Sequence, residues 1–142
     1  MMPSGVYELI TEHDGLIDLG ITSDRVIESQ SVDTRPFNDG YFVTVAFEER
    51  LLSATSAIRR GPRTMTVAVH TPDETTREYG TINVILSLIT EALSEAENYL
   101  GQDGMEISEI ALNGESGNLV DEGYKTLTRF ATYRVSYHEK AA

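Results

Sequence analysis

Apolar residues recur with a helical period in the middle of the chain. Between residues 82 and 100 they are spaced by three and four, which places them on one face of a helix. These residues are Ile82, Ile85, Leu86, Ile89, Leu93, Ala96 and Leu100. Thr75 and Glu78 have the spacing of a capping box, and Gly101 stands where a glycine typically ends a helix. The pattern predicts one long amphipathic helix that ends at Leu100.

A shorter helix is predicted near the start of the chain. The apolar residues of segment 6–10 share one helical face, and Ser4 stands in the N-cap position. We expect this helix to cover about 5–12. The Asp-Gly pair at 14–15 and the Leu-Gly pair at 19–20 are expected to break it.

Alternation of apolar and polar residues with a period of two predicts the strands. It is clearest in 41–47, 64–70 and 126–137, which are rich in β-branched and aromatic residues. Segments 25–28 and 105–112 predict two further strands. The strands outnumber the helices and do not alternate regularly with them. This order predicts an α+β fold with a largely antiparallel or mixed sheet, covered on one face by helices.

Polar segments with glycine or proline predict the connections. Segments 29–40 and 116–123 are expected to be loops, and Asn-Gly at 113–114 a tight turn. The segment 48–63 is far longer than a hairpin needs, and long loops in compact domains are usually functional or mobile. We expect it to become ordered only on assembly. The length of 142 residues predicts a single domain over 1–142.

Composition narrows the classes of function. The chain has no cysteine, which excludes disulfides, thiolate metal sites and cysteine nucleophiles. No segment has the apolar run of a signal peptide or of a membrane span, so a cytoplasmic, soluble protein is expected. The net charge of −12 argues against wrapping by nucleic acid and against anionic membranes.

The charge is distributed unevenly along the chain. Segment 78–124 holds ten acids and no Lys or Arg, whereas 50–77 holds five arginines and two acids. Such segments either form a solvated surface or provide complementary contacts between subunits. The candidate residues for a subunit or partner interface are Arg59, Arg60, Arg63, Arg77, Asp121 and Glu122.

A search for catalytic and metal-binding patterns finds none that is complete. The glycine-containing segments 101–104 and 114–117 lack a P-loop lysine, and Ser116 has Asn118 where a nucleophile elbow requires its second glycine. Asp and Glu at 121–122 lack the ligand spacing of a calcium loop. His70, at a strand end, favours a structural hydrogen bond over a catalytic or ligand-binding role. We expect no catalytic residue, metal or cofactor.

The order of these elements resembles the tail terminator, or tail-completion, proteins of long-tailed phages, in particular the minor-tail-protein-U-like proteins. The resemblance spans nearly the whole chain and depends on the order of weak motifs. These are Val6-Tyr7-Glu8-Leu9-Ile10, Arg25-Val26-Ile27, Tyr41-Phe42-Val43-Thr44-Val45, Thr64-Met65-Thr66-Val67-Ala68-Val69-His70, an acidic turn into the long helix, Ser116-Gly117-Asn118-Leu119-Val120-Asp121-Glu122 and the strand Arg129 to Tyr137. Family members often have Trp in the strand ending at His70, where this chain has Ala68 and no Trp at all.

The resemblance implies a virion protein of the tail–neck region, assembled in the bacterial cytoplasm. It implies a hexameric ring that caps the tail tube and joins the tail to the head. Its partners would be other copies of itself, the major tail protein and a head–tail connector or head-closure protein. Genomic DNA would pass through the ring without sequence-specific contact, and an acidic channel lining would let it slide.

Two alternatives remain. A head-closure or adaptor protein of the neck has similar size and symmetry, and the neighbouring genes would distinguish it from a terminator. A small enzyme or ligand-binding domain would use His70 with nearby carboxylates. Under that alternative His70→Ala would abolish an activity; otherwise only a modest effect on stability is expected.

Overall fold

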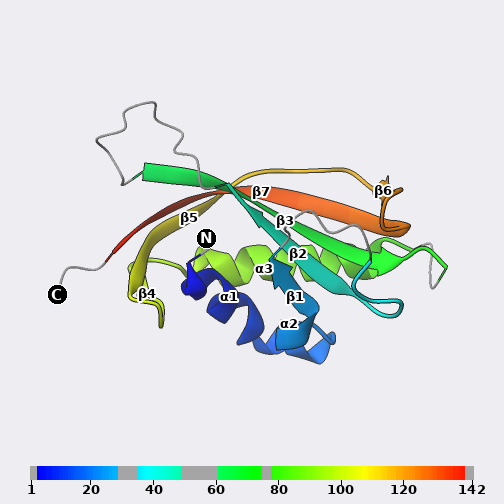
Figure 1. The fold of residues 1–142 in the computed structure, drawn as a ribbon, viewed down its shortest axis with the longest axis horizontal. Coiled ribbons are helices and arrows are strands. Elements are labelled where there is room, and N and C mark those ends of the chain that lie inside the picture. The colour runs from blue at the N-terminus through cyan, green and yellow to red at the C-terminus, as the bar shows by residue number, and fades with distance from the viewer. Residues whose placement is uncertain (1–2, 29–34, 49–60, 75–77, 140–142) are drawn as a thin grey trace.

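The computed structural model describes residues 3–28, 35–48, 61–74 and 78–139. All the helices in these ranges lie on the same side of a single seven-stranded sheet (Figure 1). The helices are α1 (Ser4–Thr11), α2 (Asp14–Asp18), the short 3-10 helix η1 (Ser23–Arg25) and α3 (Gly80–Ser94). The strands are β1 (Val26–Glu28), β2 (Phe42–Phe47), β3 (Gly61–Pro72), β4 (Tyr99–Leu100), β5 (Met105–Glu115), β6 (Leu119–Asp121) and β7 (Thr126–Glu139).

The sheet is mixed, with neighbouring strands in the order β1-β2-β3-β7-β5-β4, and β6 pairs with β7. Only β1 and β2 run parallel; the other strand pairs in the described ranges are antiparallel. β7 pairs with β3 along one side and with β5 and β6 along the other. The predicted α+β class, with a mixed sheet and helices on one face, is confirmed.

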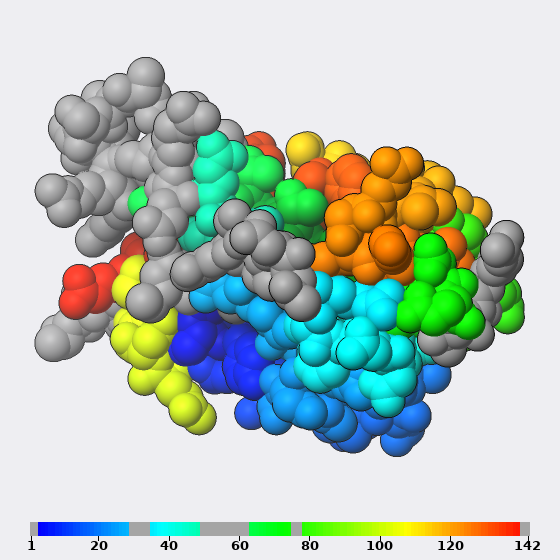
Figure 2. All heavy atoms as spheres, turned by 45° about the vertical axis from the view of Figure 1, so that its right-hand side comes forward, coloured from blue at the N-terminus to red at the C-terminus, as the bar shows by residue number. Residues whose placement is uncertain are grey.

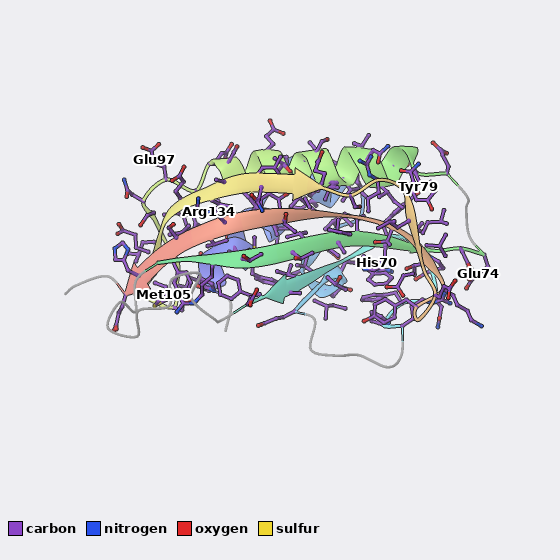
Figure 3. The ribbon with its side chains drawn as sticks, turned by 90° about the horizontal axis from the view of Figure 1, so that it is seen from above. His70, Glu74, Tyr79, Glu97, Met105 and Arg134 are labelled. Atoms are coloured by element: carbon purple, nitrogen blue, oxygen red, sulfur yellow. The ribbon has the colours of Figure 1, made fainter. Side chains whose placement is uncertain are left out.

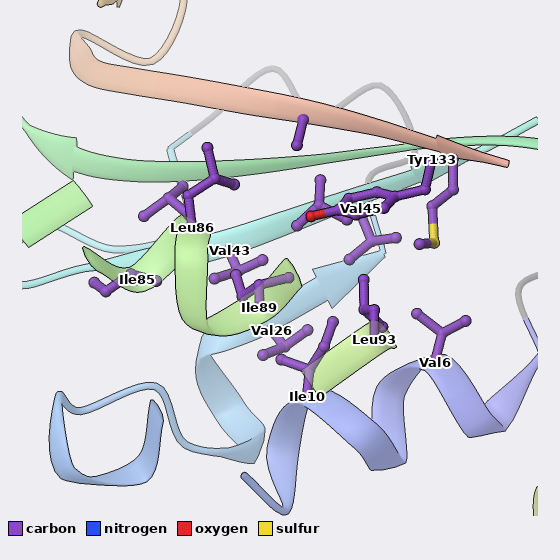
Figure 4. Close-up of a cluster of buried hydrophobic side chains, with 14 of the residues drawn as sticks. Val6, Ile10, Val26, Val43, Val45, Ile85, Leu86, Ile89, Leu93 and Tyr133 are labelled. Carbon is purple, nitrogen blue, oxygen red and sulfur yellow. The ribbon is translucent and has the colours of Figure 1, made fainter. Parts of the chain in front are cut away.

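The core lies between the helices and one face of the sheet. Val43 pairs with Val69, and Val67 pairs with Ala131, so the odd-numbered residues of β2, β3 and β7 share this face. Figure 4 shows side chains of α1 and α3 meeting them. The fully buried members include Val6, Ile10, Ile85, Ile89, Leu93, Val43, Val45 and Val67. Tyr133 joins this core and its hydroxyl lies 2.7 Å from Thr90 Oγ1, which satisfies the buried polar group.

The first helix matches its predicted position, but Ser4 is its first residue and not its N-cap, which is Pro3 without a side-chain hydrogen bond. The chain also does not leave helical structure where expected. α1 ends at Thr11, and α2 begins at Asp14, within the predicted Asp-Gly break. Burial explains the difference, because Leu16 of α2 is fully buried against the core. Gly20 then ends this region with φ of 88°, as a glycine can.

The long helix is shorter than predicted. α3 begins at Gly80 and ends at Ser94, and its N-cap residue Tyr79 makes no capping hydrogen bond. Thr75, from the expected capping box, lies outside the described residues. Ala96 is buried although it follows the helix, and the chain then turns into β4.

Gly101 does not end a helix, and it is required for another reason. A Cβ at this position would lie 2.7 Å from Ser4 Oγ and 2.8 Å from the backbone nitrogen of Gly5. The start of α1 therefore packs directly on the turn before β5. Asp103 Oδ2 accepts a hydrogen bond of 2.8 Å from the Ser4 amide in the same contact.

Two predicted connections are strands. Asn113 and Gly114 lie within β5, where the pairing register shifts, so they form no tight turn. The expected loop 116–123 contains β6. Both follow from the length of β7, since β5 pairs with its residues from Glu139 back to Ala131 and β6 pairs with its first residues, Thr126 to Thr128. The expected long loop overlaps β3, which begins at Gly61, and residues 49–60 are outside the described ranges.

The other face of the sheet has no helix over it within the described part of the chain. Most of its central residues are small or β-branched; Phe130 and Arg134 are the exceptions. They are Thr44 and Ala46 of β2, Thr64, Thr66 and Ala68 of β3, and Phe130, Thr132, Arg134 and Ser136 of β7. We call this set the uncovered face. None of the helices in the described ranges is long and apolar enough to cross a membrane.

Candidate functional site

His70 lies near the end of β3, on the side of the sheet away from the helices, and only 4% of it is exposed. Its Nδ1 lies 2.9 Å from Thr126 Oγ1, and its Nε2 lies 3.1 Å from Thr44 Oγ1. A neutral imidazole has one donor and one acceptor nitrogen, so both threonine hydroxyls are satisfied. The structural hydrogen bond predicted for His70 is confirmed, and it is a double one that joins β2, β3 and β7.

Aromatic rings surround this histidine. The ring of Phe42 stacks on His70 at a centroid distance of 5.0 Å, and Tyr124 meets it edge-on at 5.4 Å. Phe37 lies 5.6 Å from Phe42, and the Arg25 guanidinium sits 4.2 Å above the Phe37 ring. These rings exclude water from His70, and Figure 3 shows the histidine at the same end of the sheet as Glu74 and Tyr79.

Burial lowers the pKa of His70 to about 4, and the nearby Asp121 carboxylate raises it by a smaller amount. The imidazole is therefore neutral at neutral pH. A general base works best when its pKa lies near the operating pH, and it must reach its substrate. With both nitrogens bonded to threonines and the ring buried, His70 has the environment of a structural residue.

A second group of contacts at this end of the sheet centres on Arg35. Its guanidinium lies 2.6 Å and 3.3 Å from the Glu74 carboxylate oxygens. It also donates to the carbonyl oxygens of Tyr124 and Lys125, at 3.4 Å and 3.3 Å, and to Asn38 Oδ1. Hydrogen bonding with Arg35 lowers the pKa of Glu74 to about 2. The sequence showed no pattern that singles out Arg35.

These contacts hold segment 35–41 across the ends of three strands. Figure 2 shows this segment (cyan) lying against the β6–β7 region (orange) and the end of β3 (green). The Thr71 hydroxyl adds a hydrogen bond of 2.9 Å to the Gly40 carbonyl oxygen. Segment 35–41 therefore covers His70 and the rings of Phe42 and Tyr124 that contact it, which we call the His70 cluster. Arg35 makes the main polar contacts that hold this segment in place.

Replacing Arg35 with alanine is expected to speed amide exchange in segment 36–41 several-fold, because the charged hydrogen bonds to Glu74 and to two carbonyl oxygens are lost. The midpoint of urea unfolding should change little. Amide exchange followed by NMR checks this. Arg134→Ala is the matched control, since the Arg134 side chain is exposed and makes no hydrogen bond with the described residues. Equal exchange in both variants would contradict the anchoring role.

A serine, a histidine and a glutamate meet at the far end of β5 and β7, a group that the sequence did not indicate. Ser108 Oγ lies 3.3 Å from His138 Nδ1, and His138 Nε2 lies 3.9 Å from Glu106 Oε1. A catalytic nucleophile and the base that activates it lie about 2.6–3.2 Å apart. Ser108 sits where the β5 register shifts, which brings its hydroxyl toward His138. These distances describe a polar surface contact, not an assembled nucleophile.

The predicted interface residues are not brought together within one subunit. Arg63 pairs with Val135 near the start of β3, and its guanidinium lies 4.9 Å from the ring centroid of Tyr137. Asp121 lies at the other end of the sheet, where its Oδ1 accepts a hydrogen bond of 3.0 Å from the Tyr124 amide. Glu122 beside it is exposed. Arg59, Arg60 and Arg77 lie outside the described residues.

No cluster of three or more metal-ligating side chains occurs in the described ranges. Two features of the described residues remain as candidate binding surfaces. They are the uncovered face of the sheet and the charged surfaces at its edges. No protein-family model and no curated protein matches this chain.

Proposed function

We propose that this protein is a structural assembly protein of a long-tailed phage, a tail terminator. In this proposal its copies form a ring, hexameric by the resemblance, that caps the tail tube. The ring joins the tail to the head through a connector or head-closure protein. The protein acts by binding other copies of itself and its neighbours in the virion, without catalysing a reaction.

The main observation that supports the proposal is the uncovered face of the sheet. The cores of protein interfaces are depleted in charged residues. Charged residues make up 24% of the chain, yet Arg134 is the only Asp, Glu, Lys or Arg among the nine residues of β2, β3 and β7 that define this face. Glu106 and Glu109 of β5, which pair with His138 and Ser136, lie at its border. Phe130 is partly exposed among threonines and alanines. Small side chains on a sheet face let a second surface approach closely, as in stacked sheets about 10 Å apart.

The charge distribution suits a closed ring. Head-to-tail contacts in a ring require two different, complementary surfaces on each subunit. Arg63 and Asp121 lie at opposite ends of β3 and its partner strands, so they can only meet between subunits. The run from 78 to 124, which has ten acids and no Lys or Arg, provides the negative surface.

The order of elements also supports the proposal. The described chain has a first helix, a short strand, two long strands, a main helix and two further long strands, as the resemblance requires. α2, β4 and β6 are additions to this order. An excess of acids, with a net charge of −12, would keep the passing DNA from adhering to the ring.

Negative-stain electron microscopy and sedimentation velocity of the concentrated protein, alone and with tail tubes, test the proposal. We expect closed rings, and rings at the ends of tubes. Thr66→Arg places a charge on the uncovered face and is expected to leave monomers with unchanged circular dichroism. Ser87→Arg, on the exposed side of α3, is the matched control and should still form rings.

Each outcome has a definite meaning. Bare tube ends and only monomers of the unsubstituted protein would refute the terminator role. If Thr66→Arg forms rings as readily as Ser87→Arg does, the contact between subunits lies elsewhere than on the uncovered face. A lumen lined by Arg59, Arg60 and Arg63 would refute the acidic channel.

A further inference from the structure

Among the described residues, no strand pairs with most of one edge of β5. On one side it pairs with β7, and on the other β4 pairs only with Glu106 and Ile107. The last backbone hydrogen bond on that side within the described ranges runs from the Asn98 amide to the Ser108 carbonyl oxygen, at 3.3 Å. Beyond it, in 109–113, the N–H and C=O groups that point away from β7 have no strand partner in the described chain. Such an edge accepts an added strand.

A groove runs beside this edge. It has a volume of about 320 Å³ and lies between β5 and the chain that follows α3. Its lining residues are Ser94, Ala96, Glu97, Ser108, Glu109 and Ile110. Ala96 and Ile110 are buried and provide an apolar floor, whereas Glu97 and Glu109 are exposed. Figure 3 shows Glu97 just past the end of α3, on the β5 side of the sheet and far from His70.

The groove is negative and has no cation of its own. Neither Glu97 nor Glu109 forms an ion pair in the described part of the chain, and the sequence has no Lys or Arg from 78 through 124. Glu95 is exposed nearby and has the same sign. Complementary charge decides which partner such a surface accepts more than it decides the total affinity.

We propose that the free edge of β5 and this groove bind an extended, positively charged segment of a partner protein as an added β-strand. The added strand continues the line of β4 along 109–113, so main-chain hydrogen bonds provide the attachment. A small apolar side chain faces Ala96 and Ile110, and Lys or Arg on either side meets Glu97 and Glu109. This inference depends on the sheet edge and the charge of the groove, and it does not depend on the tail role.

A short peptide of alternating lysine and valine is the probe. Isothermal titration calorimetry should show binding to the full-length protein, and NMR amide exchange of 109–113 should slow when it is bound. A block peptide, with all its lysines before its valines, has the same charge without the strand pattern and should bind about tenfold more weakly, or not at all. A peptide of alternating glutamate and valine should not bind.

Charge reversal in the groove is the matched test. Glu97→Lys with Glu109→Lys is expected to weaken binding of the lysine–valine peptide by about tenfold or more. Glu12→Lys with Asp18→Lys changes the net charge equally on exposed residues of the α1–α2 region and should leave binding unchanged. Unchanged circular dichroism would show that both variants are folded.

Three results would overturn the inference. They are absence of binding, equal binding of the block peptide, and equal loss in both charge-reversal variants. A concentration-dependent dimer that the Glu97→Lys/Glu109→Lys variant loses would assign the edge to a second copy of this chain, against the partner proposed here. Ring formation is assayed with the unsubstituted protein and peptide binding by calorimetry, so failure of either result leaves the other proposal to be judged on its own.

Discussion

His70→Ala is expected to lower the free energy of unfolding by about 4 kcal/mol, combining the loss of a large buried side chain with two unsatisfied hydroxyls. The variant removes the ring that stacks on Phe42 and leaves Thr44 Oγ1 and Thr126 Oγ1 without their partner. Urea unfolding followed by circular dichroism measures the change. The modest effect on stability expected from the sequence is thus revised, because the ring is buried and bonded at both nitrogens.

His138→Ala is the matched control. His138 is partly exposed, its side chain having 30% of its surface accessible, and its contacts at 3.3 Å and 3.9 Å are long. Its substitution should lower the free energy of unfolding by less than about 1 kcal/mol, as is usual for surface positions. A cost for His70→Ala as small as that for His138→Ala would contradict the role of His70 in joining three strands.

The free energy of unfolding is also expected to fall by about 3 kcal/mol between pH 6.5 and pH 4 because of His70 alone. This figure follows because a shift of one pKa unit corresponds to about 1.4 kcal/mol. The ordinary pKa of histidine is 6.5, and burial lowers that of His70 to about 4 in the folded protein. In this window the unfolded chain binds a proton that the folded protein does not bind. Stability is therefore highest above pH 6.5, decreases toward pH 4 and receives no further change from His70 below it.

Urea unfolding at intervals of pH, compared with His70→Gln, isolates this contribution. Glutamine does not titrate, so the difference between the two proteins should shrink as the pH falls through the window. The lowered carboxyl pKa of Glu74 begins to reduce stability as the pH falls through its ordinary value of 4.5, at the lower end of this window, and those of Asp103 and Asp24 do so through 3.8. These groups are the same in both proteins, so the comparison with His70→Gln removes their contribution. Parallel stability curves for the two proteins from pH 7 to pH 4 would contradict a low pKa for His70.

The alternation of side chains made the main strands predictable, because burial on one face of a sheet imposes a period of two on the sequence. The ends of α3 were not predictable in the same way. Ala96 and Leu100 fit the helical period, yet the first is buried after the helix has ended and the second is half exposed in β4. The contact of Gly101 with Ser4 joins residues that are far apart in the chain, and local sequence carries no signal for it.

The His70 cluster shows the same limit. That the histidine ends a strand follows from its sequence, whereas its partners Thr44 and Thr126 are 26 and 56 residues away and depend on the strand order. Arg35 lies in a polar segment without periodicity, so only the folded chain shows that it contacts Glu74 and the β6–β7 connection. The uncovered face was predicted only as the absence of a second helical layer.

The position of β7 has a consequence for how the protein is made. β3 and β5 do not pair with each other, and β7 is the strand that joins them, although it follows every other strand in the chain. During translation the β1–β2–β3 and β4–β5 parts have no strand in common to pair with until β7 leaves the ribosome. Pairings between distant segments must overcome loop-closure entropy and form slowly. The nascent chain therefore holds exposed strand edges until synthesis of β7 is complete, which makes completion of the sheet a late event in its folding.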